Sequence, residues 1–299
     1  RPGDAASPNA LTTVTITAGG SGDGTVTVDA DANRTATSDA SALAASFSGA
    51  VALLIPTATI DGKIQAAING VVDLSASDVT VNAYGKNLAQ SETVALSFSL
   101  GLAAALTGAK TQILSGADVL ALVGSSVDIT TSGAVKVLAT GDNDAITQSD
   151  AGSGAAVGIA GSTLLATIAG AVKAELNGDV TDANIIKVEA IGNNFADATA
   201  LAISVGLAGG AGANSHAEIT SAADVEALVG STATLKVPGA AIDVLATGVN
   251  KAEADAFGGT AGLGLAISVM LPTAIVGGGV KAKFDGDILE GSASYLNVI

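Results

Sequence analysis

One short pattern recurs along this chain at nearly constant spacing. It alternates apolar with polar residues and ends in alanine, and its first copy is Val26-Thr27-Val28-Asp29-Ala30. Further copies begin at Val79, Val135, Ile186 and Ile242, at offsets of 53, 56, 51 and 56 residues, and a partial sixth copy begins at Leu296. A fixed period of this kind predicts an elongated fold in which each unit buries its apolar face against the next.

A second motif, Ala-x-Gly-x-Asn, follows four of these copies. Its asparagines are Asn87, Asn143, Asn194 and Asn250. Glycine and asparagine favour positive φ and local hydrogen bonds, so the motif predicts a turn after each short strand. The first unit carries only Ala30-Asp31-Ala32-Asn33, one residue shorter. Alternate units are most alike, because residues 117–125 recur almost unchanged as residues 223–231.

Bulky and small residues alternate in the uncharged part of each unit. Examples are residues 94–102, 201–208 and 263–269. A period of two predicts β-strands with bulky side chains on one face and Gly, Ala and Ser on the other, and disfavours transmembrane helices. Two interpretations of the small face stay open. It packs against a second wall of the same unit, or it is a flat patch for lateral association with another copy.

These patterns predict an all-β fold: a parallel β-solenoid, or β-helix, of about five repeats of 51–56 residues. Residues 1–25 form an N-terminal extension and first strand, and residues 26–299 form the repeats. In residues 117–123 and 223–229, periodicity does not decide between a short helical turn and a strand. The start, Arg1-Pro2-Gly3-Asp4, has neither an initiating Met nor a signal segment, so we expect a processed product or an excised piece.

Composition excludes several classes of function. The chain has 12 Lys and Arg against 28 Asp and Glu, a net charge of −16, which disfavours nucleic acid as a partner. It has no Cys and one His, His216, which leaves no thiolate chemistry and no choice of Ser/His/Asp arrangements. We expect His216 to be a solvent-facing strand residue, and we expect no catalytic residues, no bound organic cofactor and no enzymatic activity.

The sequence favours calcium as a ligand over any substrate. Oxygen-bearing side chains come close together in two segments that we expect to be turns, and hard cations prefer such clusters. The candidate calcium ligands are Asp29, Asp31, Asn33, Asp142, Asn143 and Asp144. Solvated turns without a bound ion are the favoured alternative.

The strand motifs resemble the Gly/Ala-rich repeats of very large secreted bacterial surface proteins, the filamentous, leukotoxin-like adhesins. The resemblance covers roughly residues 20–299 and lies in the general pattern of the repeats. It implies a right-handed β-solenoid on or outside a bacterial cell, serving as an adhesin stalk or a biofilm matrix fibre. The chain departs from those adhesins in its short length and in lacking a separate binding head.

Three classes of function follow. The first is a structural protein that self-associates head to tail, because solenoid ends invite strand addition. The terminal strands would carry the contact, through Leu11, Val14, Ile16, Leu296 and Val298. The alternative is an adhesin stalk or binding module for glycan or host protein. An ice-binding solenoid belongs to this second class but lacks a regular Thr array. A polysaccharide-cleaving β-helix enzyme is the least favoured of the three, because only Arg1 and Arg34 supply arginine.

Overall fold

The computed structural model describes residues 11–16, 24–289 and 293–299, and for residues 11–16 it describes the backbone only. The described residues form β-strands joined by short turns, and none of them is in a helix. The start of the chain, for which we expected processing or excision, lies outside these ranges.

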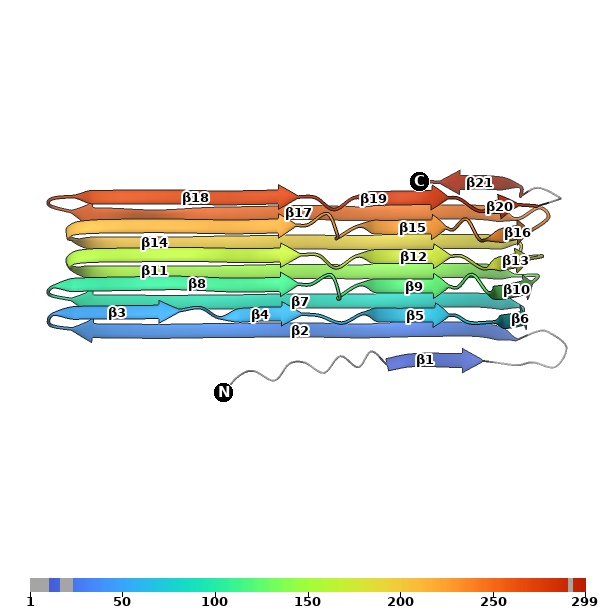
Figure 1. Ribbon diagram of the computed structural model, residues 1–299, viewed down its shortest axis with the longest axis horizontal. Helices are drawn as coiled ribbons and strands as arrows, with labels where there is room; N and C mark the ends of the chain where they lie inside the picture. The colour runs from blue at the N-terminus through green and yellow to red at the C-terminus, as the bar shows by residue number, and fades with distance from the viewer. Residues whose placement is uncertain (1–10, 17–23, 290–292) are drawn as a thin grey trace.

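Four kinds of strand follow one another along the chain (Figure 1). The long strands are β2 (Thr25–Ser46), β7 (Asp78–Ser99), β11 (Ala134–Ile168), β14 (Ile185–Ile219) and β17 (Ala241–Gly262). The return strands are β3 (Gly49–Leu54), β4 (Thr57–Ile60), β8 (Leu102–Ile113) and β18 (Ala266–Val276), together with the second parts of β11 and β14, which continue through the bend.

Two sets of short strands complete each passage of the chain, by which we mean the stretch from the start of one long strand to the start of the next. The first set is β5 (Ile64–Ile68), β9 (Val119–Val123), β12 (Val172–Leu176), β15 (Val225–Val229) and β19 (Val280–Phe284). The second set is β6 (Val72–Ala76), β10 (Val127–Thr131), β13 (Asp179–Thr181), β16 (Thr234–Lys236) and β20 (Asp287–Ile288). The segments at 117–123 and 223–229, which the sequence left undecided, therefore contain strands β9 and β15.

Neighbouring passages pair in parallel and in register. Val26 pairs with Val79, Val79 with Val135, Val135 with Ile186, and Ile186 with Ile242. The strand order is β1-β2-β7-β11-β14-β17-β21 in the main sheet, with two smaller parallel sheets made of the short strands. The prediction of an all-β fold with parallel sheets is confirmed, and the sequence offsets are the pairing register.

The interior changes character along the long axis. Toward the right of Figure 1, Val and Ile side chains of the long strands pack against those of β5, β9, β12 and β15. Toward the left, the two walls meet through a core that is mostly alanine, with buried Ser and Thr. Here the Ser91 and Thr111 hydroxyls hydrogen-bond across the interior at 2.8 Å, as do those of Ser162 and Ser149 at 2.9 Å. Small side chains let the walls approach closely.

The small face of the alternating segments therefore points inward, which agrees with the first of the two interpretations, packing against a second wall of the same unit, and not with the second, a patch for lateral association. Ala95 and Ser97 are fully buried, whereas Leu96 and Phe98 between them are 39 and 49 % exposed. The narrow interior accepts only the small residues, so the bulky ones are left on the outer surface.

The Ala-x-Gly-x-Asn motif is not a turn. Gly85, Gly141, Gly192 and Gly248 lie inside long strands, and none has a positive φ. A Cβ on Gly85 would lie 2.5 Å from Val119 Cγ2, and one on Gly248 would lie 2.7 Å from Val280 Cγ2. Glycine is needed because the valines of the facing short strands occupy the space of a side chain.

Candidate assembly surfaces

A ladder of asparagine side chains runs through the interior, across the long strands. The Nδ2 of Asn87 donates to Oδ1 of Asn143 at 2.7 Å, Asn143 donates to Asn194 at 2.8 Å, and Asn194 donates to Asn250 at 2.7 Å. Each amide thus bonds to the amide of the next strand rather than to its own turn. Identical side chains stacked in register give such ladders in parallel sheets, and a fully bonded buried network specifies one register.

Arg34 occupies the first position of the ladder. It pairs with Asn87 in the strand register, and its Nε donates to Asn87 Oδ1 at 2.8 Å. Its Nη1 donates to the carbonyls of Asp61 and Gly62. Burial lowers the pKa of the guanidinium, and the charge of Asp61 opposes that shift. From the sequence we expected the motif of the first unit to be one residue shorter, and this is wrong. Arg34 takes the position of the asparagine, and Asn33 lies on the outer face.

The N-terminal edge of the main sheet is partly covered. Strand β1 (Leu11–Ile16) pairs antiparallel with β2, with Leu11, Val14 and Ile16 opposite Asp31, Val28 and Val26. From the sequence we expected these residues to form a terminal strand at an uncapped edge. Instead, an antiparallel strand occupies the edge of Val26–Asp31, and beyond Asp31 the one described strand that pairs with β2 is β7.

The C-terminal edge is also partly covered (Figure 1, top). In the described part of the chain, β18 pairs only with β14 and β19 only with β15. Strand β21 (Tyr295–Val298) pairs in parallel with residues 241–244 of β17, placing Leu296 opposite Ile242 and Val298 opposite Val244. The Ala246 N–H also donates to the Ile299 carbonyl at 2.8 Å, and beyond Ala246 the only strand paired with β17 among the described residues is β14.

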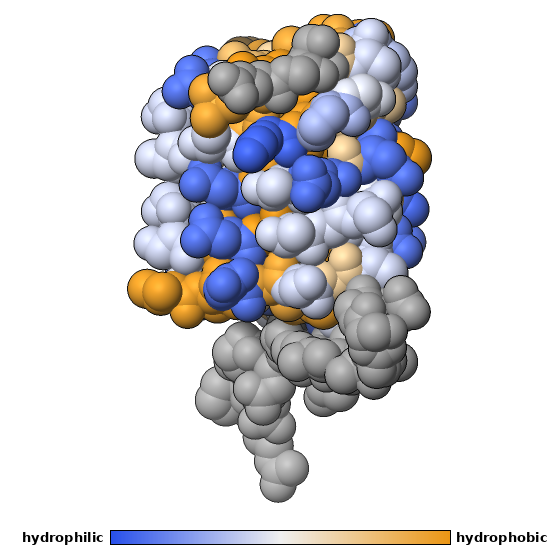
Figure 2. Space-filling view, turned by 90° about the vertical axis from the view of Figure 1, so that its right-hand side faces the viewer, coloured by the Kyte–Doolittle hydropathy of each residue, from blue (hydrophilic) through white to orange (hydrophobic). Residues whose placement is uncertain are grey.

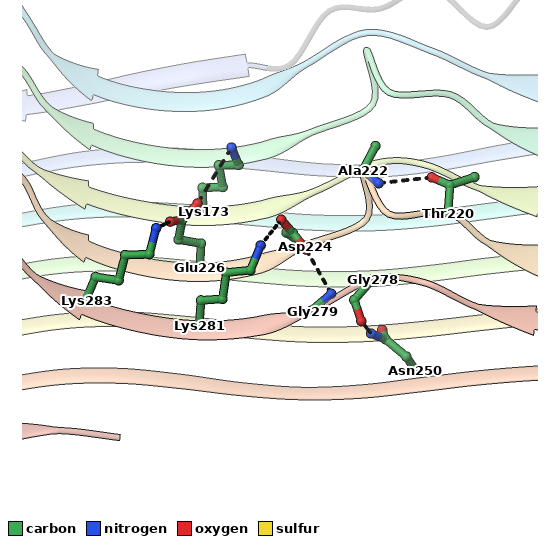
Figure 3. A network of polar contacts seen from close by, with 10 residues as sticks. All are labelled: Lys173, Thr220, Ala222, Asp224, Glu226, Asn250, Gly278, Gly279, Lys281 and Lys283. Carbon is green, nitrogen blue, oxygen red and sulfur yellow. Dashed lines mark hydrogen bonds and ion pairs between the residues drawn. The ribbon is translucent and has the colours of Figure 1, made fainter.

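A polar network lies near this edge (Figure 3). Asp224 accepts hydrogen bonds from Lys281 Nζ at 2.5 Å and from the Gly279 N–H at 2.8 Å. Burial raises the pKa of Asp224, but these two bonds and the nearby lysine charge outweigh burial and hold it below its ordinary value. Glu226 lies between Lys173 and Lys283, at 3.9 and 3.2 Å. At the end of the ladder, Asn250 Nδ2 donates to the Gly278 carbonyl at 2.9 Å.

Asp224 belongs to a recurring set of aspartates at the strand starts. Asp78, Asp118, Asp179 and Asp224 each accept a hydrogen bond from a backbone N–H of the next passage at 2.8 Å. Each therefore ties two successive passages together where the backbone would otherwise lack an acceptor.

The predicted calcium residues lie on strands, not at turns. Asp29, Asp31 and Asn33 alternate along the outer face of β2. Asp142 and Asp144 point outward from β11, with Asp142 3.5 Å from Lys86, whereas Asn143 points inward into the ladder. The structure thus does not bring Asn143 to the face of its two neighbours. Within residues 24–289 and 293–299, no three acidic or histidine side chains gather as a metal site, and calcium binding stays a prediction.

Asp197 lies in an acidic group on the outer face. Burial is the main cause that raises the pKa of Asp197, and Glu253 and then Asp255 add to it, while the Thr199 hydroxyl and Lys251 lower it. Lys251 lies 2.7 Å from Glu253. His216 is half-exposed on the outer face of β14 as predicted, with Nε2 3.2 Å from Glu218.

The charges are confined to one part of the molecule. Residues 40–60, 93–109, 151–172, 198–215 and 256–280 contain no Asp, Glu, Lys or Arg, and the strand register gathers these stretches toward the left of Figure 1. The opposite end, seen in Figure 2, carries many hydrophilic side chains. We did not predict this division of charge from the sequence, although the uncharged stretches recur at the repeat spacing and were a usable signal.

An apolar hollow of about 630 Å³ lies at the charge-free end. Its lining is Ala45, Ser46, Phe47, Phe98, Ser99, Leu100 and Gly154. Phe47 and Leu100 are 85 and 72 % exposed, so the hollow is open to solvent. It contains no charged or amide side chain with which to orient a polar ligand.

Comparison with protein-family models, with curated proteins and with solved structures found no match for this chain. The described residues also include no helix that is long and apolar enough to cross a membrane.

Proposed function

We propose that this chain is a non-enzymatic structural β-solenoid of five circuits and the start of a sixth, and that it joins end to end into an extracellular bacterial surface or matrix filament. The observation that carries the proposal is the C-terminal edge. In the described part of the chain, β18 and β19 have no strand paired on their outer side, and β18 carries no charge. Pro272 of β18 and Lys281 and Lys283 of β19 block only part of this edge. Natural sheets block such edges with charges, Pro or covering segments, so a long edge of low charge invites a further strand layer.

The first circuit of another copy has the matching pattern. Val26, Val28 and Ala30 of β2 hold the same positions in their circuit as Ile242, Val244 and Ala246 of β17. Strand addition at such an edge gains main-chain hydrogen bonds, with side-chain pockets setting the register. Flush docking requires that β1 leave the N-terminal edge and that β21 leave the C-terminal edge, because these two short strands occupy the same part of the joint.

Truncation tests this joint. We expect negative-stain electron microscopy to show filaments that form faster when residues 1–18 are deleted, and fastest when residues 294–299 are removed as well. The matched control keeps both termini and changes Thr130, which is exposed on β10, to Ser. Filament growth that is identical in all these proteins, or no filament in any of them, would contradict the proposal.

The binding-module alternative gains less support. A glycan needs polar side chains to orient its hydroxyl groups, and the hollow lined by Phe47, Phe98 and Leu100 is apolar. The acidic net charge and the repeat pattern suit either a stalk or a filament, and the resemblance to filamentous adhesins supports the extracellular setting for both.

A further inference from the structure

The charge-free end exposes an unusual amount of bulky apolar surface on the return wall. We call the outer side of residues 49–60, 101–109, 157–172, 208–215 and 264–280 the apolar return face. Its large side chains include Val51, Leu53, Leu102, Leu106, Val157 and Ile159, which are 38–63 % exposed. Contiguous apolar patches of this kind on a soluble protein mark interaction sites.

The face is made of parallel strand layers in register, of which the fourth, residues 208–215, has no bulky apolar side chain. Five parallel layers build it, contributed by β3 and β4, β8, β11, β14 and β18. Leu106 lies over the glycine of the next layer, since a Cβ on Gly161 would be 2.9 Å from Leu106 Cδ2. The Leu106 side chain thus packs over the glycine beside it, and a surface of this kind is suited to packing against another sheet.

Its size fits a protein interface. Roughly ten residues of each layer span about 33 Å, and five layers span about 24 Å, so the face covers on the order of 800 Å². A standard specific interface buries about the same area, ~800 Å², on each partner.

The charge distribution identifies the partner. The acidic residues that give the net charge of −16 all lie outside this face, in the other part of each passage. Two copies that overlap only at these faces, with their charged parts pointing away from each other, bury apolar surface without bringing acidic groups together. We propose that the apolar return face docks on the same face of a second copy, forming a closed dimer.

A lipid bilayer is the other surface that takes up apolar side chains, and the structure favours it less. The sheet edges at β2 and β18 have unpaired backbone groups, which are costly in hydrocarbon. The chain has no Trp, and its two tyrosines, Tyr84 and Tyr295, lie outside the charge-free stretches, so the aromatic belt of an interface is missing.

Sedimentation velocity of the full chain tests the dimer. We expect a dimer at micromolar concentration for the unmodified protein and a monomer for Leu106→Lys/Ile159→Lys. Two controls add a lysine elsewhere and stay dimeric: Phe98→Lys on the opposite wall and Thr130→Lys in the charged part. Circular dichroism checks that each variant folds. The contact uses walls rather than edges, so filaments seen by microscopy test the proposed function separately.

A milder substitution covers the case in which the double variant does not fold. Because the chain has no Cys, Ile159→Cys introduces a single thiol. We expect its reaction with a thiol reagent to slow about tenfold on going from dilute to concentrated protein, with no such change for Thr130→Cys. A monomeric unmodified protein, a folded double variant that stays dimeric, or concentration-independent labelling would overturn the proposal. A monomer that floats with phosphatidylcholine vesicles would assign the face to lipid instead.

Discussion

At the scale of single residues, asparagine has two roles in this protein: some side chains form the buried ladder, and others face solvent. Asn194 is buried and bonded to the asparagines on both sides, whereas its neighbour Asn193 points to solvent. The sequence identified the recurring asparagines but assigned them to turns, because an Asn after a Gly is usually a turn signal. Their inward direction depends on the facing wall, which the local sequence does not contain.

Asn194→Ala breaks the ladder in its middle. It leaves the Nδ2 of Asn143 without an acceptor and the Oδ1 of Asn250 without a donor. Each buried unpaired group costs about 1–3 kcal/mol. We expect the free energy of unfolding, measured by urea denaturation, to fall by about 3 kcal/mol. Asn193→Ala is the matched control and should change it by less than about 0.5 kcal/mol. Equal effects of the two substitutions would refute the structural role of the ladder.

Asp197 gives a pH-dependent prediction. Its pKa is raised in the folded state, first by burial and then by Glu253, so the stability it contributes is complete below its unfolded pKa of about 3.9 and is lost as pH rises through the folded pKa. Asp197→Asn removes that loss. We expect a higher Tm than the unmodified protein at pH 7 and no difference near pH 3. A Tm gain that persists at pH 3 would contradict this assignment.

At the scale of strands, the contact between each long strand and its facing short strand depends on glycine. Val225 Cγ2 occupies the space that a Cβ on Gly192 would take. The alternation of bulky and small residues predicted the strands correctly. It could not show that the bulky residues face outward, because a period of two defines two faces without saying which is buried.

Gly192→Ala should therefore overpack this contact and lower the free energy of unfolding by about 1–3 kcal/mol. Val225→Ala alone leaves a cavity and also destabilises. The double variant should cost less than the sum of the two, because the new methyl group fills the space that the valine leaves. Additive costs in a double-mutant cycle would show that the two residues do not compete for this space.

The aspartates at the strand starts make a second prediction at this scale. Asp118 Oδ1 accepts the Ala171 N–H at 2.8 Å. Asp118→Ala leaves that donor unpaired and should destabilise by about 1–2 kcal/mol. Asp118→Asn keeps an acceptor at the same place and should retain most of the stability. If Asn is as damaging as Ala, the hydrogen bond is not what holds the two passages together.

At the scale of the whole molecule, stacking in register and the division of charge decide how the chain can associate. The sequence offsets correctly predicted the pairing of every long strand, because identical apolar positions repeat at the pairing distance. The coverage of the N-terminal edge by β1 was not predictable, since antiparallel pairing of a short strand has no period to reveal it. The apolar return face required the register before its stretches could be placed side by side.

These two features place the contacts on different surfaces. The edges offer open-ended growth along the stacking direction, whereas the apolar return face offers a closed contact across it. A filament built from both would have paired protofilaments, with the acidic parts on its outside, where mutual repulsion limits further lateral growth.

End-to-end assembly is best tested by electron microscopy of the purified chain with residues 1–18 and 294–299 removed to expose both edges. We expect long filaments of uniform width with an axial repeat of about 24 Å, since five layers are each about 4.8 Å thick. Isolated short particles, at concentrations where the truncated protein remains folded, would contradict end-to-end assembly.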